Sequence, residues 1–192
     1  GMRRPAATWN PYIINFKHLW QIIADAWHTQ SFKDKFRVWF MPTGWRPADV
    51  EQKYPVYTIG RMSELKKYNP FYSKWFTAFS LMHMSVIFAL LCFLFFRFGE
   101  IEKSEALLNG IFLLLAIFGF TALLDKKQYG LISMLAVAVV VVVYCISQRD
   151  WFGINGFMPA GSVLIALYFS ATALAALWFY NHELRQSEAQ MS

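Results

Sequence analysis

Four histidines are the side chains of this sequence best suited to metal binding or proton transfer. They are His18, His28, His83 and His182. Two metal ligands on one helix face need a spacing of three or four residues, and no pair of these histidines has it. The sequence also contains no glycine-rich phosphate loop, no G-x-S-x-G motif and no pair of neighbouring cysteines. We therefore predict that this chain holds no complete metal or nucleophile site.

Two of the histidines lie where a single imidazole could still have a role. His83 lies inside a long apolar run, and an ionisable residue within a membrane span is a functional hypothesis by default. Two interpretations of His83 remain open: a neutral imidazole bonded to a neighbouring helix, or a proton or substrate role. His28 follows Trp27 near the end of a helical pattern, where the helix dipole favours a partly positive ring. Asp25, three residues earlier, could contact His28 on the same face as an acid–base pair.

The composition of the chain determines which elements can position these residues. The chain is 57% hydrophobic and 16% charged, whereas soluble domains have about 45–50% apolar and about 25% charged residues. This composition predicts a membrane protein. The two cysteines, Cys92 and Cys145, both lie in apolar runs, so we expect them to be reduced and buried.

Four apolar runs of sufficient length follow the first third of the chain. They cover about residues 75–96, 106–124, 129–147 and 158–180. Each can cross roughly 30 Å of hydrocarbon as a helix. The predicted fold is therefore all-α, with a four-helix transmembrane region at 75–181, a cytoplasmic or interfacial segment at 1–74 before it, and a cytoplasmic tail at 182–192.

Basic residues predict the orientation of these spans. Residues 1–74 contain twelve Lys and Arg against five Asp and Glu, a net charge of 12 − 5 = +7. The positive-inside rule then places residues 1–74, the turn at 125–128 and the tail in the cytoplasm, with both termini on one side of a bacterial inner membrane or an endoplasmic reticulum membrane. Aromatic residues near the predicted span ends are typical of membrane interfaces: Tyr129, Trp151, Trp178 and Tyr180.

The segment 1–74 has a helical pattern of its own. Asn10-Pro11 reads as a helix start, and the apolar residues Ile13, Phe16, Trp20, Ile23 and Trp27 recur on one face. A second helix is expected from Ser31, with Asp34 as its capping-box partner, ending in a rigid turn between Pro42 and Pro47. Residues 53–59 are expected to be extended, and Asn69-Pro70 to cap the first span.

Three interpretations of these two basic, aromatic helices remain open. They could lie in the lipid headgroup layer with lysines toward anionic lipid, pack against an adjacent domain, or contact a substrate headgroup. We do not expect a nucleic-acid partner, because the basic residues adjoin membrane spans and no recognition motif is present.

Short motifs in residues 1–60 carry a resemblance to a known family. They are Gly1-Met2-Arg3-Arg4-Pro5, Trp9-Asn10-Pro11, Asp25-Ala26-Trp27-His28-Thr29, Asp34-Lys35 and Gly44-Trp45-Arg46-Pro47-Ala48-Asp49. This series resembles the sterol desaturase / fatty acid hydroxylase superfamily, and within it the alkylglycerol-monooxygenase-like branch. In that branch a YG-x-x-x-P and W/F-N-P segment follows the last histidine box. Over the four spans the resemblance is only architectural.

The resemblance implies an integral membrane di-iron oxygenase that hydroxylates a lipid carbon. In the alkylglycerol branch the reductant is a pterin. The H-x-x-x-H and H-x-x-H-H boxes that hold the irons are absent here, so no metal ligand is carried over to any position, and di-iron and pterin are implied only for a parent enzyme. We expect the boxes to precede Gly1, so that the chain is the C-terminal portion of such an enzyme.

Two hypotheses about function follow. In the first, the chain supplies the cap and membrane anchor of a lipid hydroxylase. Its partners are the bilayer, the lipid substrate and the N-terminal catalytic half, and Trp27, His28, Trp45 and Arg46 line the headgroup entrance. In the second, the chain is a stand-alone, non-catalytic four-span protein that binds anionic lipid or a partner through its basic N-terminal arm.

Overall fold

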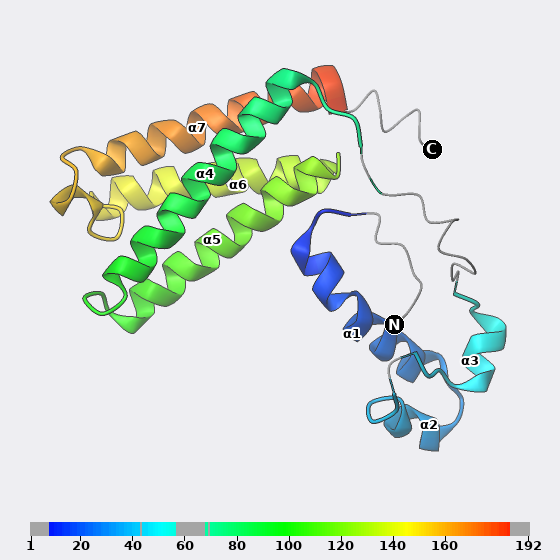
Figure 1. Cartoon of the computed structure of the whole chain (residues 1–192). Helices are drawn as coiled ribbons and strands as arrows, with labels where there is room; N and C mark the ends of the chain where they lie inside the picture. Colours follow the sequence, from blue (N-terminus) through cyan, green and yellow to red (C-terminus); the bar gives the residue numbers. More distant parts are fainter. Residues whose placement is uncertain (1–7, 43, 57–67, 69, 185–192) are drawn as a thin grey trace. The chain divides into compact units, whose positions relative to one another are not determined.

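The computed structural model describes residues 8–42, 44–56, 68 and 70–184 of the chain (Figure 1). Within these residues every regular element is a helix, which confirms the predicted all-α fold class. The chain divides into two compact units, residues 1–69 and 70–192.

The N-terminal unit contains three helices: α1 (Pro11–His28), α2 (Phe32–Arg37) and α3 (Ala48–Lys53). The predicted cap of α1 is present, because the Asn10 side chain accepts the backbone N–H groups of Tyr12 and Ile13. Ser31 caps α2 by accepting the N–H of Asp34. The return bond of a capping box is not formed, since the Ser31 N–H donates to Thr29 Oγ1 instead. Both helices therefore begin at the predicted residues.

Helix α3 was not predicted, because the sequence pattern indicated only a turn between Pro42 and Pro47 and extended chain over residues 53–59. Pro47 precedes the first helical turn, and the acidic residues Asp49 and Glu51 within that turn suit the positive end of the helix dipole. Val50 is buried beneath the helix. Residues 57–59 of the predicted extended stretch lie outside the described residues.

The second unit contains the membrane-spanning helices α4 (Lys74–Arg97), α5 (Lys103–Leu124), α6 (Gln128–Gln148) and α7 (Gly161–Phe179), with the short η2 (Ile154–Gly156) and η3 (Tyr180–Leu184). Four helices are long and apolar enough to cross a membrane, as predicted. The first three begin and end within three residues of the predicted runs. The fourth begins at Gly161 and not at 158, because Pro159 cannot continue a helix ladder and Ala160 has a left-handed backbone (φ 60°). The cap of α4 is Ser73, and the predicted cap Asn69 lies outside the described residues.

Close backbone approach holds the central helices together. Gly130, in the first turn of α6, packs on the end of α5, and a Cβ added there would lie 2.6 Å from the carbonyl carbon of Ala122. Aromatic rings pack among aliphatic side chains in the core: Trp151 is buried against Phe112, with ring centroids 4.7 Å apart. Trp151 and Tyr180 are thus buried in the protein and do not form the predicted aromatic belt, whereas Tyr129 and Trp178 are exposed.

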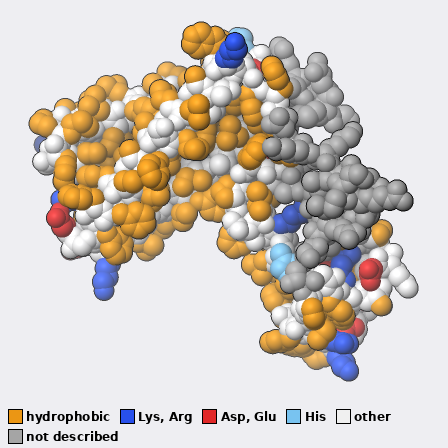
Figure 2. All heavy atoms as spheres, in the orientation of Figure 1, with side chains coloured by type: hydrophobic (Ala, Val, Ile, Leu, Met, Phe, Trp, Pro, Cys, Tyr) orange, Lys and Arg blue, Asp and Glu red, His pale blue; other side chains and the backbone are white. Residues whose placement is uncertain are grey.

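The outer surface of this unit is apolar. Hydrophobic side chains cover the face of the four long helices that Figure 2 shows, as expected for a bundle surrounded by lipid. Both cysteines are free, but Cys92 is exposed on this surface and only Cys145 is partly buried, so the prediction that both are buried was wrong for Cys92.

Polar contacts gather three distant segments at one end of the bundle. Ser73 donates its N–H and hydroxyl to the Glu183 carboxylate at 2.7 and 2.6 Å. Lys126, in the α5–α6 turn, donates to the Phe71 carbonyl at 3.0 Å, and the Tyr72 hydroxyl donates to the Leu124 carbonyl. Burial lowers the pKa of Lys126, and the charge of Glu183 opposes that shift. The start of α4, the α5–α6 turn and the end of η3 therefore share one end.

Candidate functional site

A buried ion pair joins α1 to the segment before α3. The Arg46 guanidinium donates through Nη2 to Asp25 Oδ1 at 2.7 Å and through Nε to Asp25 Oδ2 at 2.9 Å. The two side chains are 7% and 3% exposed. Arg46 also donates to the Tyr54 carbonyl, and Gln21 donates to Asp25 Oδ1. The hydrogen bond to Asp25 is the largest cause that raises the pKa of Arg46. Both oxygens of the Asp25 carboxylate accept hydrogen bonds, so the ion pair has a structural role: it holds α1 against the segment before α3.

A second contact fixes the link between α1 and α2. The Asp49 carboxylate accepts the Gln30 N–H at 2.8 Å, the Thr29 hydroxyl at 3.1 Å and the Val50 N–H at 2.9 Å. These bonds lower the pKa of Asp49, with the Gln30 N–H as the largest cause. The sequence singled out Arg46 but predicted neither its ion pair with Asp25 nor the separate contacts of Asp49 with Thr29 and Gln30. The Arg-Pro-Ala-Asp order places Asp49 in the first turn of α3, but it gives no signal for the pairing of Arg46 with Asp25, which lies 21 residues away.

The predicted contact between Asp25 and His28 is not formed. The Asp25 carboxylate is occupied by Arg46 and Gln21, while His28 Nδ1 donates to the Ala24 carbonyl at 2.7 Å. The His28 ring also lies against the Tyr54 ring, with centroids 4.5 Å apart. His28 is therefore a residue of the helix end, and the acid–base pair that its spacing from Asp25 allowed is not formed.

The four residues predicted to line the entrance differ in their exposure to solvent. Trp27 is 82% exposed and His28 is exposed. Trp45 is half-buried, with the Arg37 guanidinium 5.1 Å from its ring centre. The Arg46 guanidinium is buried in its ion pair. Tyr54 connects two of the four, since its ring touches His28 and its carbonyl accepts from Arg46.

An exposed aromatic surface covers much of α1 and α2. It consists of Ile13, Phe16, Trp20, Ile23 and Trp27 on α1 with Phe32, Phe36, Trp39 and Phe40 on and after α2. Lys17, Lys33 and Arg37 are exposed beside it, and Figure 2 shows hydrophobic and basic side chains together over these helices. The predicted apolar stripe of α1 is therefore present, but it faces outward while the polar Asp25 faces inward. Such an arrangement suits a surface that lies against lipid or another protein.

His83 lies in the middle of the helical bundle. It is 2% exposed, and its Nδ1 shares a 2.9 Å hydrogen bond with the Tyr168 hydroxyl on α7. The rings of Phe79, Phe120 and Phe169 surround the imidazole at centroid distances of 6.0, 4.9 and 6.1 Å. This contact with a neighbouring helix is the one that the neutral-imidazole interpretation predicts.

The described residues do not fit an iron centre. Among them, no group of three or more His, Cys, Asp or Glu side chains lies close enough together to hold a metal ion. The part of the chain that the structure describes therefore offers no set of ligands for the di-iron centre that the resemblance implies.

The chain is similar to a curated protein, the alkylglycerol monooxygenase of Xenopus tropicalis. The two are 24% identical over 127 residues, which is 66% of this chain and 28% of that protein. They are distant relatives. The matched part thus spans just over a quarter of the alkylglycerol monooxygenase. No family model and no solved structure matches the chain. The similarity to alkylglycerol monooxygenase agrees with the resemblance of the N-terminal motifs at the level of a distant relationship.

Proposed function

We propose that this chain supplies the cap and membrane anchor of a lipid hydroxylase of the sterol desaturase superfamily. The observation that carries this proposal is the similarity to alkylglycerol monooxygenase, and the four membrane-spanning helices support it. In this proposal the iron ligands, the pterin site and the catalytic half lie in a part of the protein that precedes residue 1, and residues 1–74, the 125–128 turn and the tail face the cytoplasm. In this proposal the chain contributes no metal ligand of its own.

The coding sequence upstream of residue 1 provides the most direct test. An in-frame open reading frame with H-x-x-x-H and H-x-x-H-H boxes is the expected result. A stop codon directly upstream, or a reading frame without histidine boxes, would reject the proposal.

A second test concerns the substrate entrance. We propose that Trp27 and His28 contact the lipid headgroup and that Trp45 and Arg46 hold that surface in place. In the full-length enzyme, Trp27→Ala and His28→Ala should each raise KM for the lipid with little change in kcat, because they remove binding contacts without touching the reacting atoms. Trp39→Ala, a change of the same kind at another exposed aromatic residue, is the matched control. An equal effect of all three variants would contradict the assignment.

The aromatic surface of α1 and α2 favours a second candidate function. In this alternative the chain acts as a stand-alone, non-catalytic membrane protein whose basic arm binds anionic lipid. Lysines beside exposed aromatic rings suit an interfacial helix on a negatively charged bilayer. The test compares the full chain in nanodiscs of phosphatidylcholine alone and with added phosphatidylglycerol. Backbone amides of α1 should exchange more slowly with phosphatidylglycerol present, and salt should reverse the effect. Identical exchange in both lipids would exclude this function.

A further inference from the structure

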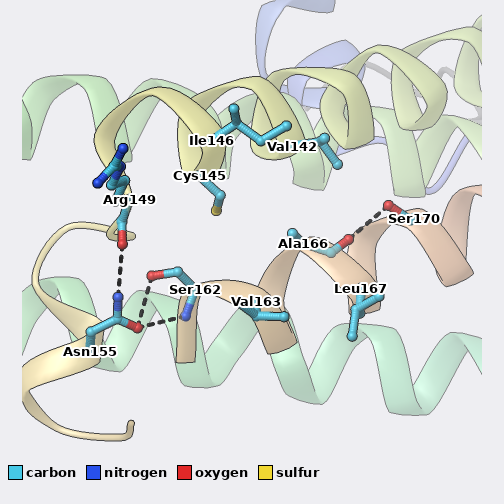
Figure 3. A pocket seen from close by; sticks show the side chains of 10 residues that line it. All are labelled: Val142, Cys145, Ile146, Arg149, Asn155, Ser162, Val163, Ala166, Leu167 and Ser170. Carbon is cyan, nitrogen blue, oxygen red and sulfur yellow. Dashed lines mark hydrogen bonds between the residues drawn. The ribbon is translucent and has the colours of Figure 1, made fainter. Parts of the chain in front are cut away.

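A groove of about 540 Å³ lies between the C-terminal half of α6 and the N-terminal half of α7. Its walls are Val142, Cys145 and Ile146 on α6 with Val163, Ala166 and Leu167 on α7, as Figure 3 shows. Its volume falls in the range of roughly 300–1,000 Å³ that ligand pockets occupy. The groove belongs to the membrane-spanning unit and its walls are apolar, so the part of a ligand that contacts these walls must also be apolar.

One end of the groove is polar, with Arg149, Asn155 and Ser162 gathered there (Figure 3). Two of these residues use their side chains within the protein. Asn155 Oδ1 accepts from the Ser162 N–H at 3.0 Å, and Asn155 Nδ2 donates to the Arg149 carbonyl at 2.9 Å. Ser162 Oγ accepts the Trp151 N–H at 2.8 Å. These bonds hold the polar end of the groove in one shape before any ligand arrives.

The third residue, Arg149, has a free charge. Its side chain is exposed, and no ion pair or hydrogen bond from its guanidinium occurs among the described residues. The neighbouring Asp150 forms no ion pair with Arg149 among the described residues. Its Oδ1 accepts from the Asn155 N–H at 3.0 Å and from the Ser162 hydroxyl at 3.2 Å. The polar end of the groove therefore presents an unpaired cation.

The backbone of Arg149 has an unusual conformation. Arg149 is the C-cap of α6, with a left-handed φ of 57°. Glycine is the usual residue in a left-handed position at a helix end, because a Cβ is strained there. The sequence has arginine at this position, so α6 ends with a charged side chain beside the groove.

We propose that this groove binds an anionic phospholipid, with one acyl chain between α6 and α7 and the headgroup phosphate at Arg149. An acyl chain matches the apolar walls, and a guanidinium can bind a phosphate through two parallel hydrogen bonds. The single unpaired positive charge favours a headgroup with a net negative charge over a zwitterionic one. This inference does not depend on the hydroxylase function.

The test uses the full chain, purified and delipidated, and counts retained lipids by native mass spectrometry. The probes are phosphatidylglycerol and phosphatidylcholine with identical acyl chains. We expect preferential retention of phosphatidylglycerol, and at least a tenfold loss of its affinity in Arg149→Gln. Lys103→Gln is the matched control, because Lys103 is also an exposed cation at a span end but lies outside the groove. Ala166→Phe, which fills the groove and leaves Arg149 in place, should also lose the lipid.

Arg149→Gly separates lipid binding from folding. Glycine relieves the left-handed strain, so this variant should unfold at a higher temperature than the wild type without lipid while binding less phosphatidylglycerol. Three outcomes would overturn the proposal: equal retention of phosphatidylcholine, an effect of Arg149→Gln no larger than that of Lys103→Gln, or undiminished binding by Ala166→Phe.

Discussion

Removing the Arg46 side chain should loosen the N-terminal unit strongly. In Arg46→Leu the Asp25 carboxylate stays 3% exposed but keeps only Gln21 as a side-chain donor. Loss of one partner of a buried ion pair costs about 3–5 kcal/mol, because the remaining charge has no compensation. Each 1.4 kcal/mol is a tenfold change in an equilibrium constant. The local opening of α1 should therefore become roughly 100-fold to several thousand-fold more frequent.

Hydrogen–deuterium exchange of the full chain measures this opening directly. The backbone amides of α1 and α3 should exchange faster in Arg46→Leu by the factor above, while the amides of α4 to α7 serve as an internal reference. The double variant Asp25→Leu/Arg46→Leu removes both charges and should return exchange most of the way to the wild-type rate, since apolar replacement of a whole buried pair is often close to neutral. Less than a tenfold increase in the single variant would refute the structural role of Arg46, as would a double variant no better than the single one.

Three further predictions concern single contacts. Because the pKa of Asp49 is lowered, its carboxylate contributes fully to stability above the ordinary carboxyl value of 3.8, and this contribution is lost as pH falls through the lowered pKa. The protection of the α3 amides against hydrogen exchange should therefore fall with acid in the wild type but not in Asp49→Asn. Tyr168→Phe removes the hydrogen bond to His83 and should lower the free energy of unfolding by about 0.6 kcal/mol, and by at most about 1.7, in an unfolding titration in mixed micelles. A loss larger than this maximum would contradict a simple hydrogen bond between two helices. Gly130→Ala forces a Cβ onto the backbone at Leu123 and should lower the free energy of unfolding by about 1–3 kcal/mol through overpacking. The melting temperature in detergent should therefore fall. An unchanged melting temperature would contradict the close approach of α5 and α6.

The long helices were predictable because one physical requirement determines them. A segment within lipid must satisfy its backbone internally, so an apolar run of about 20 residues is a helix whatever its neighbours are. The fourth span was displaced by three residues because Pro159 and the left-handed Ala160 interrupt an otherwise apolar run. Apolarity alone does not reveal such a backbone feature.

Long-range contacts were less accessible from the sequence. Trp151 looked like an interfacial residue because it follows a span, yet it packs on Phe112 from a different helix. Asp25 looked like the partner of His28 because the two are three residues apart, yet it binds Arg46, 21 residues away. In both cases the spacing of residues along the sequence indicates only which side chains are neighbours within one helix. The contact that forms is with a residue far away in the sequence and depends on tertiary packing.

The orientation of α1 limits the possible functions of the N-terminal unit. A helix that packs in a soluble domain turns its apolar face inward, but α1 buries Asp25 and exposes Trp20 and Trp27. Fully burying a large apolar side chain is worth about 1.5–3 kcal/mol, so a surface with several such residues gains considerably when something covers it. The buried pair with Arg46 makes this outward orientation stable, since rotation of α1 would expose the pair and bury the apolar stripe. Both proposed functions require a covered aromatic surface, by a catalytic half in one and by the bilayer in the other. Salt distinguishes them, because lysines facing anionic lipid are screened, whereas an apolar protein interface is not weakened in this way.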